Sequence, residues 1–104
     1  MLISKNNIAA GDIAVFKVVT GDEVVAKIVD ITEGSFIINR PCSIIAGQQG
    51  LGLMQTLFAA DINNSDITLN KNHVIMYAPV LKEMEAHYIR TTTGIQPATT
   101  GIIK

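Results

Sequence analysis

The sequence has few charged residues and none of the long apolar runs that a membrane helix requires. Charged residues make up 16% of the 104 residues, against about a quarter in typical globular domains. Hydrophobic residues make up 48%, and surplus apolar surface on a small domain commonly forms an interface. We therefore expect an oligomer. We expect no membrane partner, because no segment has the ~20 apolar residues of a membrane span.

Positive charge is also scarce. Lysine and arginine number 8, against 9 aspartates and glutamates, which gives a net charge of −1 with histidines neutral. Proteins that hold duplex nucleic acid by bulk charge carry a positive excess. Any nucleic acid must therefore be bound locally, through stacking and a few donors, or through charge that assembly concentrates.

Cysteine is nearly absent. Cys42 is the only one, which excludes a disulfide within the chain and fits a reducing compartment. Near the N-terminus, Lys5 is not followed by an apolar run of signal-peptide length. These features predict a cytoplasmic location.

Short runs rich in β-branched residues, separated by turn residues, predict a mainly β fold. Pro41 should place a bulge or an unpaired edge in the third run. The run 53–60 is also compatible with a buried helix, since periodicity alone does not separate the two. Because the connections are short, a meander that curls into a small barrel is the simplest topology. The expected strands are 13–20, 23–32, 36–46, 53–60 with a short continuation at 67–70, and 73–80.

The pattern changes to a helical period after the last expected strand. In "LKEMEAHYIR" (81–90), Leu81, Met84 and Tyr88 share one helical face, which predicts one amphipathic helix. We expect a single domain over residues 1–91 that includes this helix. Residues 92–104, in which "TTGI" occurs twice, are expected to form a flexible or strand-adding tail.

The middle of the chain is almost free of charge. From Gly34 to Ala60 the only ionisable side chains are those of Arg40 and Cys42. Edge strands without charge readily pair with another chain. If each subunit lends an edge to the next, the contact is heterologous and can close as a ring. We therefore expect a homo-oligomeric ring.

Two stretches have the form of paired motifs. "VTGDEVVAKIVDITEGSFIIN" (19–39) runs through a strand, a Gly turn, a long bent strand and a tight turn to apolar residues that end in Asn. "NKNHVIMYAPV" (70–80) leads from lysine and histidine into an apolar strand. Together they resemble the two motifs of the Sm-like family, which includes the bacterial host-factor RNA chaperone. Here Asn72 stands where the family has the lysine of its Lys-His pair, and the helix is C-terminal rather than N-terminal. The short apolar chain is also similar to small proteins of tailed phages.

The resemblance implies a small, strongly bent five-stranded antiparallel barrel, here with a C-terminal helix, in a ring that binds single-stranded RNA around its pore. It places the contacts in the loop between the second and third strands and in the loop between the fourth and fifth. There an aromatic or amide plane stacks on a base, while lysine and histidine donate to phosphate or sugar. Carried over by position, the contacts are Phe36, Asn39, Lys71, Asn72 and His73. Arg40 is a secondary candidate, because it is the lone charge in its region.

Several of these residues also have a plainer interpretation. Lys71 and His73 suit an ordinary turn before a strand, and Phe36 at the start of a strand suits the core. Asn39, close to Pro41, suits a bulge. The sequence leaves both interpretations open.

Catalytic and metal-binding patterns are not evident. The loop "GQQGLG" (47–52) lacks the Lys-Ser/Thr of a phosphate-cradling loop. The pairs Asp30/Glu33 and Asp61/Asp66 have neither a partner nucleophile nor metal-ligand spacing. We therefore expect no enzyme, no cofactor and no metal.

The sequence thus favours non-catalytic binding of single-stranded nucleic acid, RNA in preference to DNA, in RNA processing or regulation. The alternative is a structural or assembly protein in which the ring and the tail make protein contacts. A third, weaker possibility is a small enzyme that uses Asp30, Glu33 or His73 as acid or base. Such an enzyme would need a deep pocket that joins at least two of them.

Overall fold

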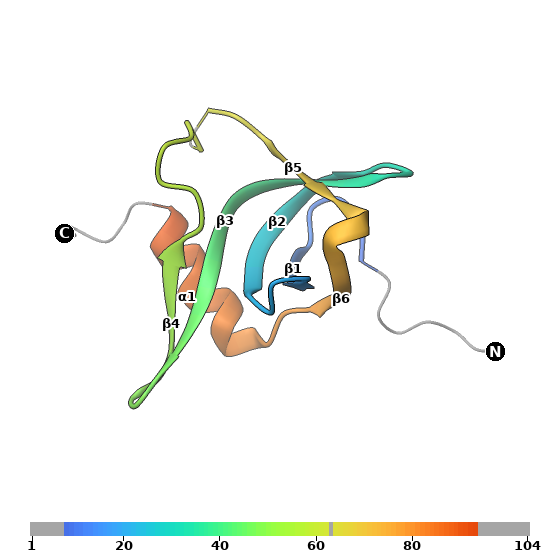
Figure 1. Cartoon of the computed structure of the whole chain (residues 1–104). Coiled ribbons are helices and arrows are strands. Elements are labelled where there is room, and N and C mark those ends of the chain that lie inside the picture. Colours follow the sequence, from blue (N-terminus) through green and yellow to red (C-terminus); the bar gives the residue numbers. More distant parts are fainter. Residues whose placement is uncertain (1–7, 63, 94–104) are drawn as a thin grey trace.

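The computed structural model describes residues 8–62 and 64–93 (Figure 1). In this part of the chain, six antiparallel strands form one curled sheet, and a helix packs against it. The strands run in the order β4-β3-β2-β1-β6, and β5 also pairs with β3. The elements are β1 (Ile13–Val18), β2 (Glu23–Ile31), β3 (Ser35–Gly47), β4 (Gly50–Gln55), β5 (Ile67–Asn70), the 3₁₀ helix η1 (Lys71–His73), β6 (Val74–Pro79) and α1 (Lys82–Thr92).

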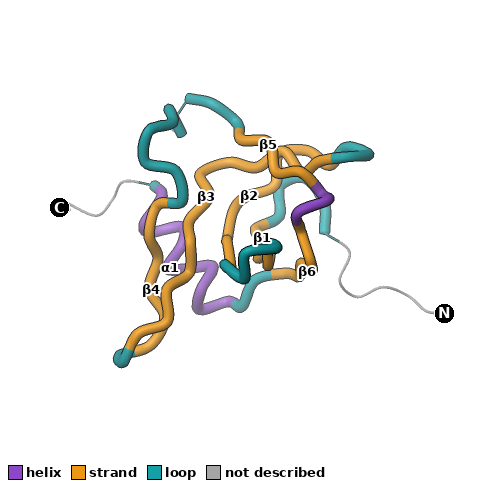
Figure 2. The backbone as a smooth tube through the Cα atoms, viewed as in Figure 1, coloured by secondary structure: helices purple, strands orange, loops and turns teal. Residues whose placement is uncertain are grey.

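The mainly β fold with a C-terminal helix is confirmed, but the expected five strands and barrel are wrong. β4 pairs with the second half of β3, and β5 pairs with its first half. The two therefore take the place of the expected fourth strand, which the loop 56–66 interrupts. Within the described residues β5 and β6 do not pair with each other, so the sheet is not closed. Only η1 joins their ends (Figure 2).

A bulge bends β3 in its middle. Two residues of β3, Arg40 and Pro41, face the single residue Ala26 of β2. Proline has no N–H to give to the ladder, and Arg40 has the left-handed φ of 49° that bulges of this kind accommodate. The bulge expected from Pro41 is confirmed. It lets the two halves of β3 take different partners, β5 before the bend and β4 after it.

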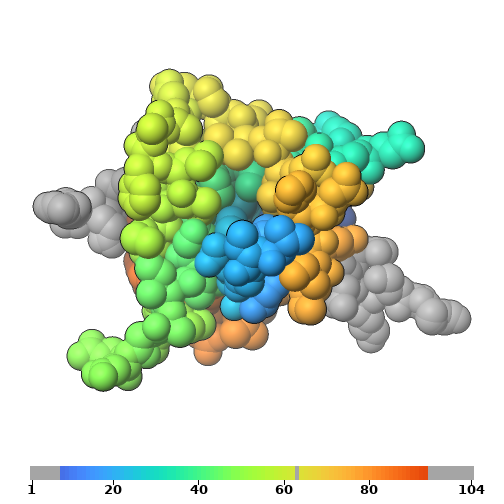
Figure 3. All heavy atoms as spheres, viewed as in Figure 1, coloured from blue at the N-terminus to red at the C-terminus, as the bar shows by residue number. Residues whose placement is uncertain are grey.

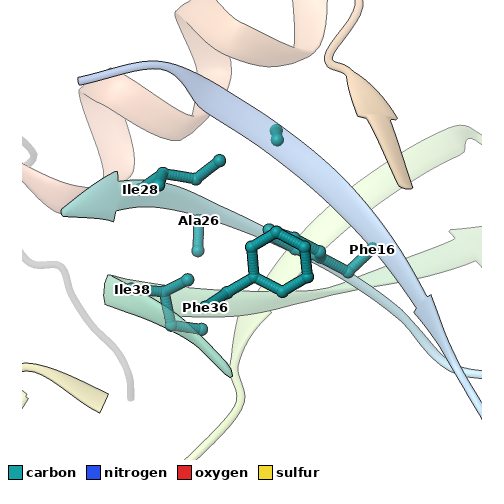
Figure 4. Close-up of a cluster of buried hydrophobic side chains, with 6 residues drawn as sticks. Phe16, Ala26, Ile28, Phe36 and Ile38 are labelled. Carbon is teal, nitrogen blue, oxygen red and sulfur yellow. The ribbon is translucent and has the colours of Figure 1, made fainter. Parts of the chain in front are cut away.

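The inner face of the curled sheet holds the larger core. Phe16 on β1 and Phe36 on β3 lie with ring centroids 4.9 Å apart, and neither residue is more than 2% exposed. Figure 4 shows both rings in a cluster supplied by β1, β2 and β3. Burial of such large rings contributes several kcal/mol in total, so it holds these three strands in their curl. The cluster consists of Ala14, Phe16, Ala26, Ile28, Phe36 and Ile38.

Helix α1 covers the opposite face of the sheet. Its buried residues are Met84 and Tyr88, and Tyr88 packs in a second cluster with Val25 and Cys42. The expected helix over 81–90 is therefore confirmed, one residue later at its start and two residues longer at its end.

The expected tail lies mostly beyond the described part. Helix α1 includes Thr92, while residues 94–104 lie outside the described residues, so a flexible or strand-adding tail stays a prediction. Among the helices that the structure describes, none has the length and apolar character needed to cross a membrane.

Candidate nucleic-acid interface

The three polar residues Lys71, Asn72 and His73 form the 3₁₀ helix η1 between β5 and β6. The side chain of Asn70 caps this turn, since its Oδ1 accepts a hydrogen bond from the backbone N–H of Asn72 at 2.8 Å. Asparagine commonly caps turns in this way. The interpretation of "NKNH" as a turn by its own chemistry is confirmed. Asn72 and His73 are exposed, and Lys71 is half-buried.

Two neighbouring turns lie against η1. The backbone N–H of Lys71 donates to the carbonyl of Gly34 at 2.9 Å, and the N–H of Val19 donates to the carbonyl of His73 at 2.9 Å. The β2–β3 turn (32–34), the β1–β2 turn (19–22) and η1 therefore meet, and we call this group the turn junction. Figure 3 shows these segments side by side on the surface. The two loops that the Sm-like resemblance invokes are thus adjacent.

Phe36 is not available to a base, in contrast to its proposed stacking role. It is 2% exposed, because its ring packs on Phe16 inside the core. The plainer interpretation, a core residue at the start of a strand, is the one that the structure shows. Phe36 nevertheless contacts the turn junction, since the Lys71 amine lies 5.3 Å from the centroid of its ring. That cation–π geometry restrains the lysine side chain.

Tyr77 on β6 is an aromatic residue that the sequence analysis did not select. Its ring meets Phe36 edge-on, with centroids 5.1 Å apart and planes at 68°, and 49% of the residue is exposed. Its exposure follows from the missing pairing between β5 and β6. Tyr77 pairs with Phe16 across the ladder, so its side chain lies on the core-facing side of the sheet. It lies there at the opening between the unpaired strands β5 and β6. Nothing in the local pattern separates it from a buried strand residue.

Asn39 and Arg40 lie away from the turn junction. β5 pairs with residues 35–38 and leads into η1 at the Ser35 end, so Asn39 lies beyond its other end. Its side-chain amide donates to Asp66 at 3.4 Å. The guanidinium of Arg40 donates to the carbonyl of Thr92, at the end of α1, at 2.7 Å. The structure therefore does not bring Asn39 and Arg40 together with the junction residues, and their role as binding residues stays a prediction.

Tyr88 of α1 and Cys42 of β3 are titratable groups buried between the helix and the sheet. Burial raises the pKa of the Tyr88 hydroxyl to about 12 and that of the Cys42 thiol to about 11. Both groups are therefore neutral near pH 7. A neutral buried thiol is a poor nucleophile, so Cys42 has a packing role here.

The turn junction carries no excess of positive charge. Lys71 and His73 come from η1, while the adjoining turns contribute the exposed carboxylates of Asp22 and Glu33. The Asp22 carboxylate accepts a hydrogen bond from the Thr20 hydroxyl at 2.8 Å, within its own turn. A ligand held here would depend on stacking and hydrogen bonds more than on net charge.

The strands β4 and β6 end the sheet, so each has an unpaired edge in the described part of the chain. Neither strand contains a charged residue, and natural proteins usually protect exposed edges with charge. Large apolar side chains are exposed on both strands, with exposed fractions of 43–60%. These are Leu51 and Met54 on β4, Ile45 on the adjoining part of β3, and Ile75, Met76 and Tyr77 on β6.

The surface hollows at the β3–β4 hairpin, near α1 and beside Gly11 are lined by none of the acid–base candidates Asp30, Glu33 and His73. The hollow at the β3–β4 hairpin has a volume of about 670 Å³ and is lined by apolar residues, glycine and glutamine, from Ile45 to Leu53. A smaller apolar hollow near α1 includes Glu23 as its one carboxylate. Among the described residues, no three His, Cys, Asp or Glu side chains are grouped as metal ligands.

No protein-family model and no curated protein matches this chain.

Proposed function

We propose that this chain is a non-catalytic protein of Sm-like type that binds single-stranded nucleic acid, RNA in preference to DNA, at the turn junction of a homo-oligomeric ring. The observation that carries the proposal is the hydrogen bond from the Lys71 N–H to the Gly34 carbonyl at 2.9 Å. It holds η1 against the β2–β3 turn. Three polar side chains are thereby fixed on a rigid support rather than on a free loop.

The chemistry of the junction suits an unpaired strand. The Lys71 amine can meet a phosphate, and Asn72 and His73 offer donors and acceptors to base edges or to the ribose 2′-hydroxyl. Tyr77, half exposed beside Phe36, supplies the aromatic face on which a base can stack. This replaces Phe36 in the stacking role that the Sm-like resemblance assigned to it.

Two edges without charged residues support the proposed ring. The β4 edge of one copy and the β6 edge of the next are both free of charge and both apolar, so they suit each other as a head-to-tail contact. Repetition of the junction around the ring would multiply weak contacts through effective concentration. Multiplication of contacts offsets the lack of positive charge in each copy.

The pairing of β3 supports the proposal at the level of strand order. β4 and β5 both pair with β3, one with its second half and the other with its first half, so the two are equivalent to one strand interrupted by the loop 56–66. The lone, buried Cys42 supports the expectation of a reducing, cytoplasmic compartment.

A structural or assembly protein is the second candidate. Exposed apolar side chains on β4 and β6 favour it, because they support protein contacts whether or not the junction binds a ligand. In that case the ring would form in the same way and no nucleic acid would bind.

Binding of labelled 12-mers separates the two candidates. Fluorescence anisotropy with U-rich and A-rich RNA and DNA should show saturable binding at micromolar or lower concentration. The salt dependence should be shallow, because few phosphates are contacted. If none of the 12-mers binds at low salt, where electrostatic attraction is strongest, the second candidate replaces the first. A monomeric mass in light scattering at micromolar concentration would exclude the ring.

A further inference from the structure

An apolar hollow lies between the start of α1 and the face of the sheet that α1 covers. Val15 and Ile44, both partly buried, line it from the sheet. Leu51 on β4 and Leu81 before α1 line it too, and they are 55% and 68% exposed, so its mouth is apolar. Its volume is about 120 Å³. Since an apolar cavity of about 150 Å³ holds a benzene molecule, this hollow has room for one aliphatic side chain.

Carboxylate residues accompany this hollow. Glu23 is part of its lining. Pro79 and Val80 line it as well, and they also line a second hollow of about 330 Å³, to which Asp12 and Glu85 contribute. The two hollows are therefore adjacent. Of the described residues, no lysine or arginine lines either of them.

Two lysines lie close to these hollows in the chain. Lys17 pairs with Glu23 across the β1–β2 ladder, and Lys82 is the first residue of α1. Against these two lysines stand the three carboxylates of Glu23, Asp12 and Glu85, so negative charge prevails. A bound segment with a cationic side chain is therefore favoured over an acidic one.

The start of α1 can also bind main-chain carbonyl groups. The first N–H groups of a helix have no acceptor within the helix, and Leu81, at the N-cap position, makes no side-chain hydrogen bond to them. Because Leu81 lines the apolar hollow, these N–H groups lie beside it. A peptide brings carbonyl oxygens that accept from such groups, whereas a simple amine does not.

We propose that the two adjacent hollows, which we call the α1 groove, are a docking site for a segment of a partner protein. In this segment an apolar side chain has a lysine or arginine one or two residues away. The apolar side chain enters the hollow between Leu51 and Leu81, and the cation meets Glu23, or Asp12 and Glu85. No residue of η1 lines the α1 groove, so this site is separate from the proposed nucleic-acid site.

The test is NMR of the methyl-labelled full-length protein, whose methyl signals stay visible in a large oligomer. The probe is the acetylated and amidated pentapeptide Arg-Ala-Leu-Ala-Arg. One control peptide has glycine in place of leucine, and the other has glutamate in place of both arginines. We expect the probe to shift the methyl signals of Leu51, Val80, Leu81 and Met84 saturably, and both control peptides to bind about tenfold more weakly.

A matched pair of variants locates the site. Leu81→Lys places a charge at the mouth of the apolar hollow and should weaken binding of the probe about tenfold. Ile89→Lys changes another exposed residue of α1, about two turns later, which lines neither hollow, and it should bind like the wild type. Glu23→Gln with Glu85→Gln should reduce the preference for the arginine peptide over the glutamate peptide several-fold.

The proposal would be overturned by unsaturable shifts at millimolar probe, by equal binding of the arginine and glutamate peptides, or by equal affinities of the two lysine variants. A smaller oligomeric mass for Leu81→Lys alone would also overturn it, because the occupant would then be a second copy. Equal binding of isopentylguanidinium, which has the same apolar and cationic groups without carbonyls, would overturn the assignment to a protein segment. Nucleic-acid binding is no part of this test, so a failure of the proposed function would be seen separately.

Discussion

The hydroxyl of Tyr88 in α1 accepts a hydrogen bond from the backbone N–H of Lys27 in β2 at 3.1 Å. It also donates to the carbonyl of Asn39 at 2.8 Å, with the Arg40 carbonyl at 3.0 Å as the other acceptor. The bulge separates these backbone groups of β2 and β3, which would otherwise bond each other. One hydroxyl thus bridges the interrupted ladder and fastens the helix to the bend.

Replacement Tyr88→Phe should lower the free energy of unfolding by about 1–3 kcal/mol, because the Lys27 N–H loses its partly buried hydrogen bond to the Tyr88 hydroxyl and is left without that partner. Urea unfolding followed by circular dichroism measures this. Tyr77→Phe is the matched control, since it removes the same hydroxyl from a residue that is 49% exposed, and it should change stability by less than about 0.5 kcal/mol. Equal stabilities of the two variants would show that the bridge does not stabilise the fold.

Arg40 should act on stability and not on the ligand. Arg40→Gly and Arg40→Ala both lose the hydrogen bond to Thr92. Only alanine has a Cβ, which is sterically unfavourable at the left-handed φ of 49°. Arg40→Ala should therefore be less stable than Arg40→Gly by about 1 kcal/mol in urea unfolding. If Arg40→Gly retained α1 but bound RNA more weakly than the wild type, Arg40 would be a binding residue, as the sequence first indicated.

Stability should fall at alkaline pH. Burial raises the pKa of Cys42 from its ordinary 9.0 to about 11, and that of Tyr88 from 10.0 to about 12. The folded state therefore holds these protons after the unfolded chain has released them. The contribution is complete below about pH 9 and is lost as the pH rises through 11 and 12. The urea midpoint of the wild type should fall between pH 8 and pH 11. The midpoint of the Cys42→Ala variant should fall less steeply over the same range. A flat profile for the wild type would contradict this.

A charge on an unpaired edge should prevent assembly. Met76 on β6 is 60% exposed, and Met76→Lys places a buried lysine in the proposed contact between copies. Light scattering at micromolar concentration should then show a monomer. Leu81→Lys is the control, because Leu81 is 68% exposed but lies outside the strands, and this variant should assemble like the wild type. Assembly of both variants would exclude the β6 edge as an interface.

Much of the secondary structure follows from local chemistry. A turn that contains Gly21 and Asp22 separates β1 from β2, as the turn residues between the short runs predict, and the bulge appears where Pro41 predicts it. The turn "NKNH" is set by the Asn70 cap. These features depend on neighbours within a few residues, which a sequence displays directly.

The incorrect predictions concern features that depend on contacts between residues far apart in the sequence. The expected strand 53–60 ends at Gln55, because β3 bends away from it at Arg40. Phe36 is a core residue because Phe16 lies opposite it, and Tyr77 is exposed because β5 and β6 remain unpaired. Arg40 meets α1, 52 residues later. None of these pairings is visible in a local pattern of residues.

If η1 holds nucleic acid, a matched pair of double variants should differ in affinity. Lys71→Ala with His73→Ala removes two turn side chains outside the core, while Lys82→Ala with His87→Ala removes the same residue types from α1. Anisotropy with the 12-mer that the wild type binds best should show at least a tenfold weaker affinity for the first variant, with its oligomeric mass unchanged, and wild-type affinity for the second. Equal affinities of the two variants, or loss of the oligomer in the first alone, would contradict the assignment of this site.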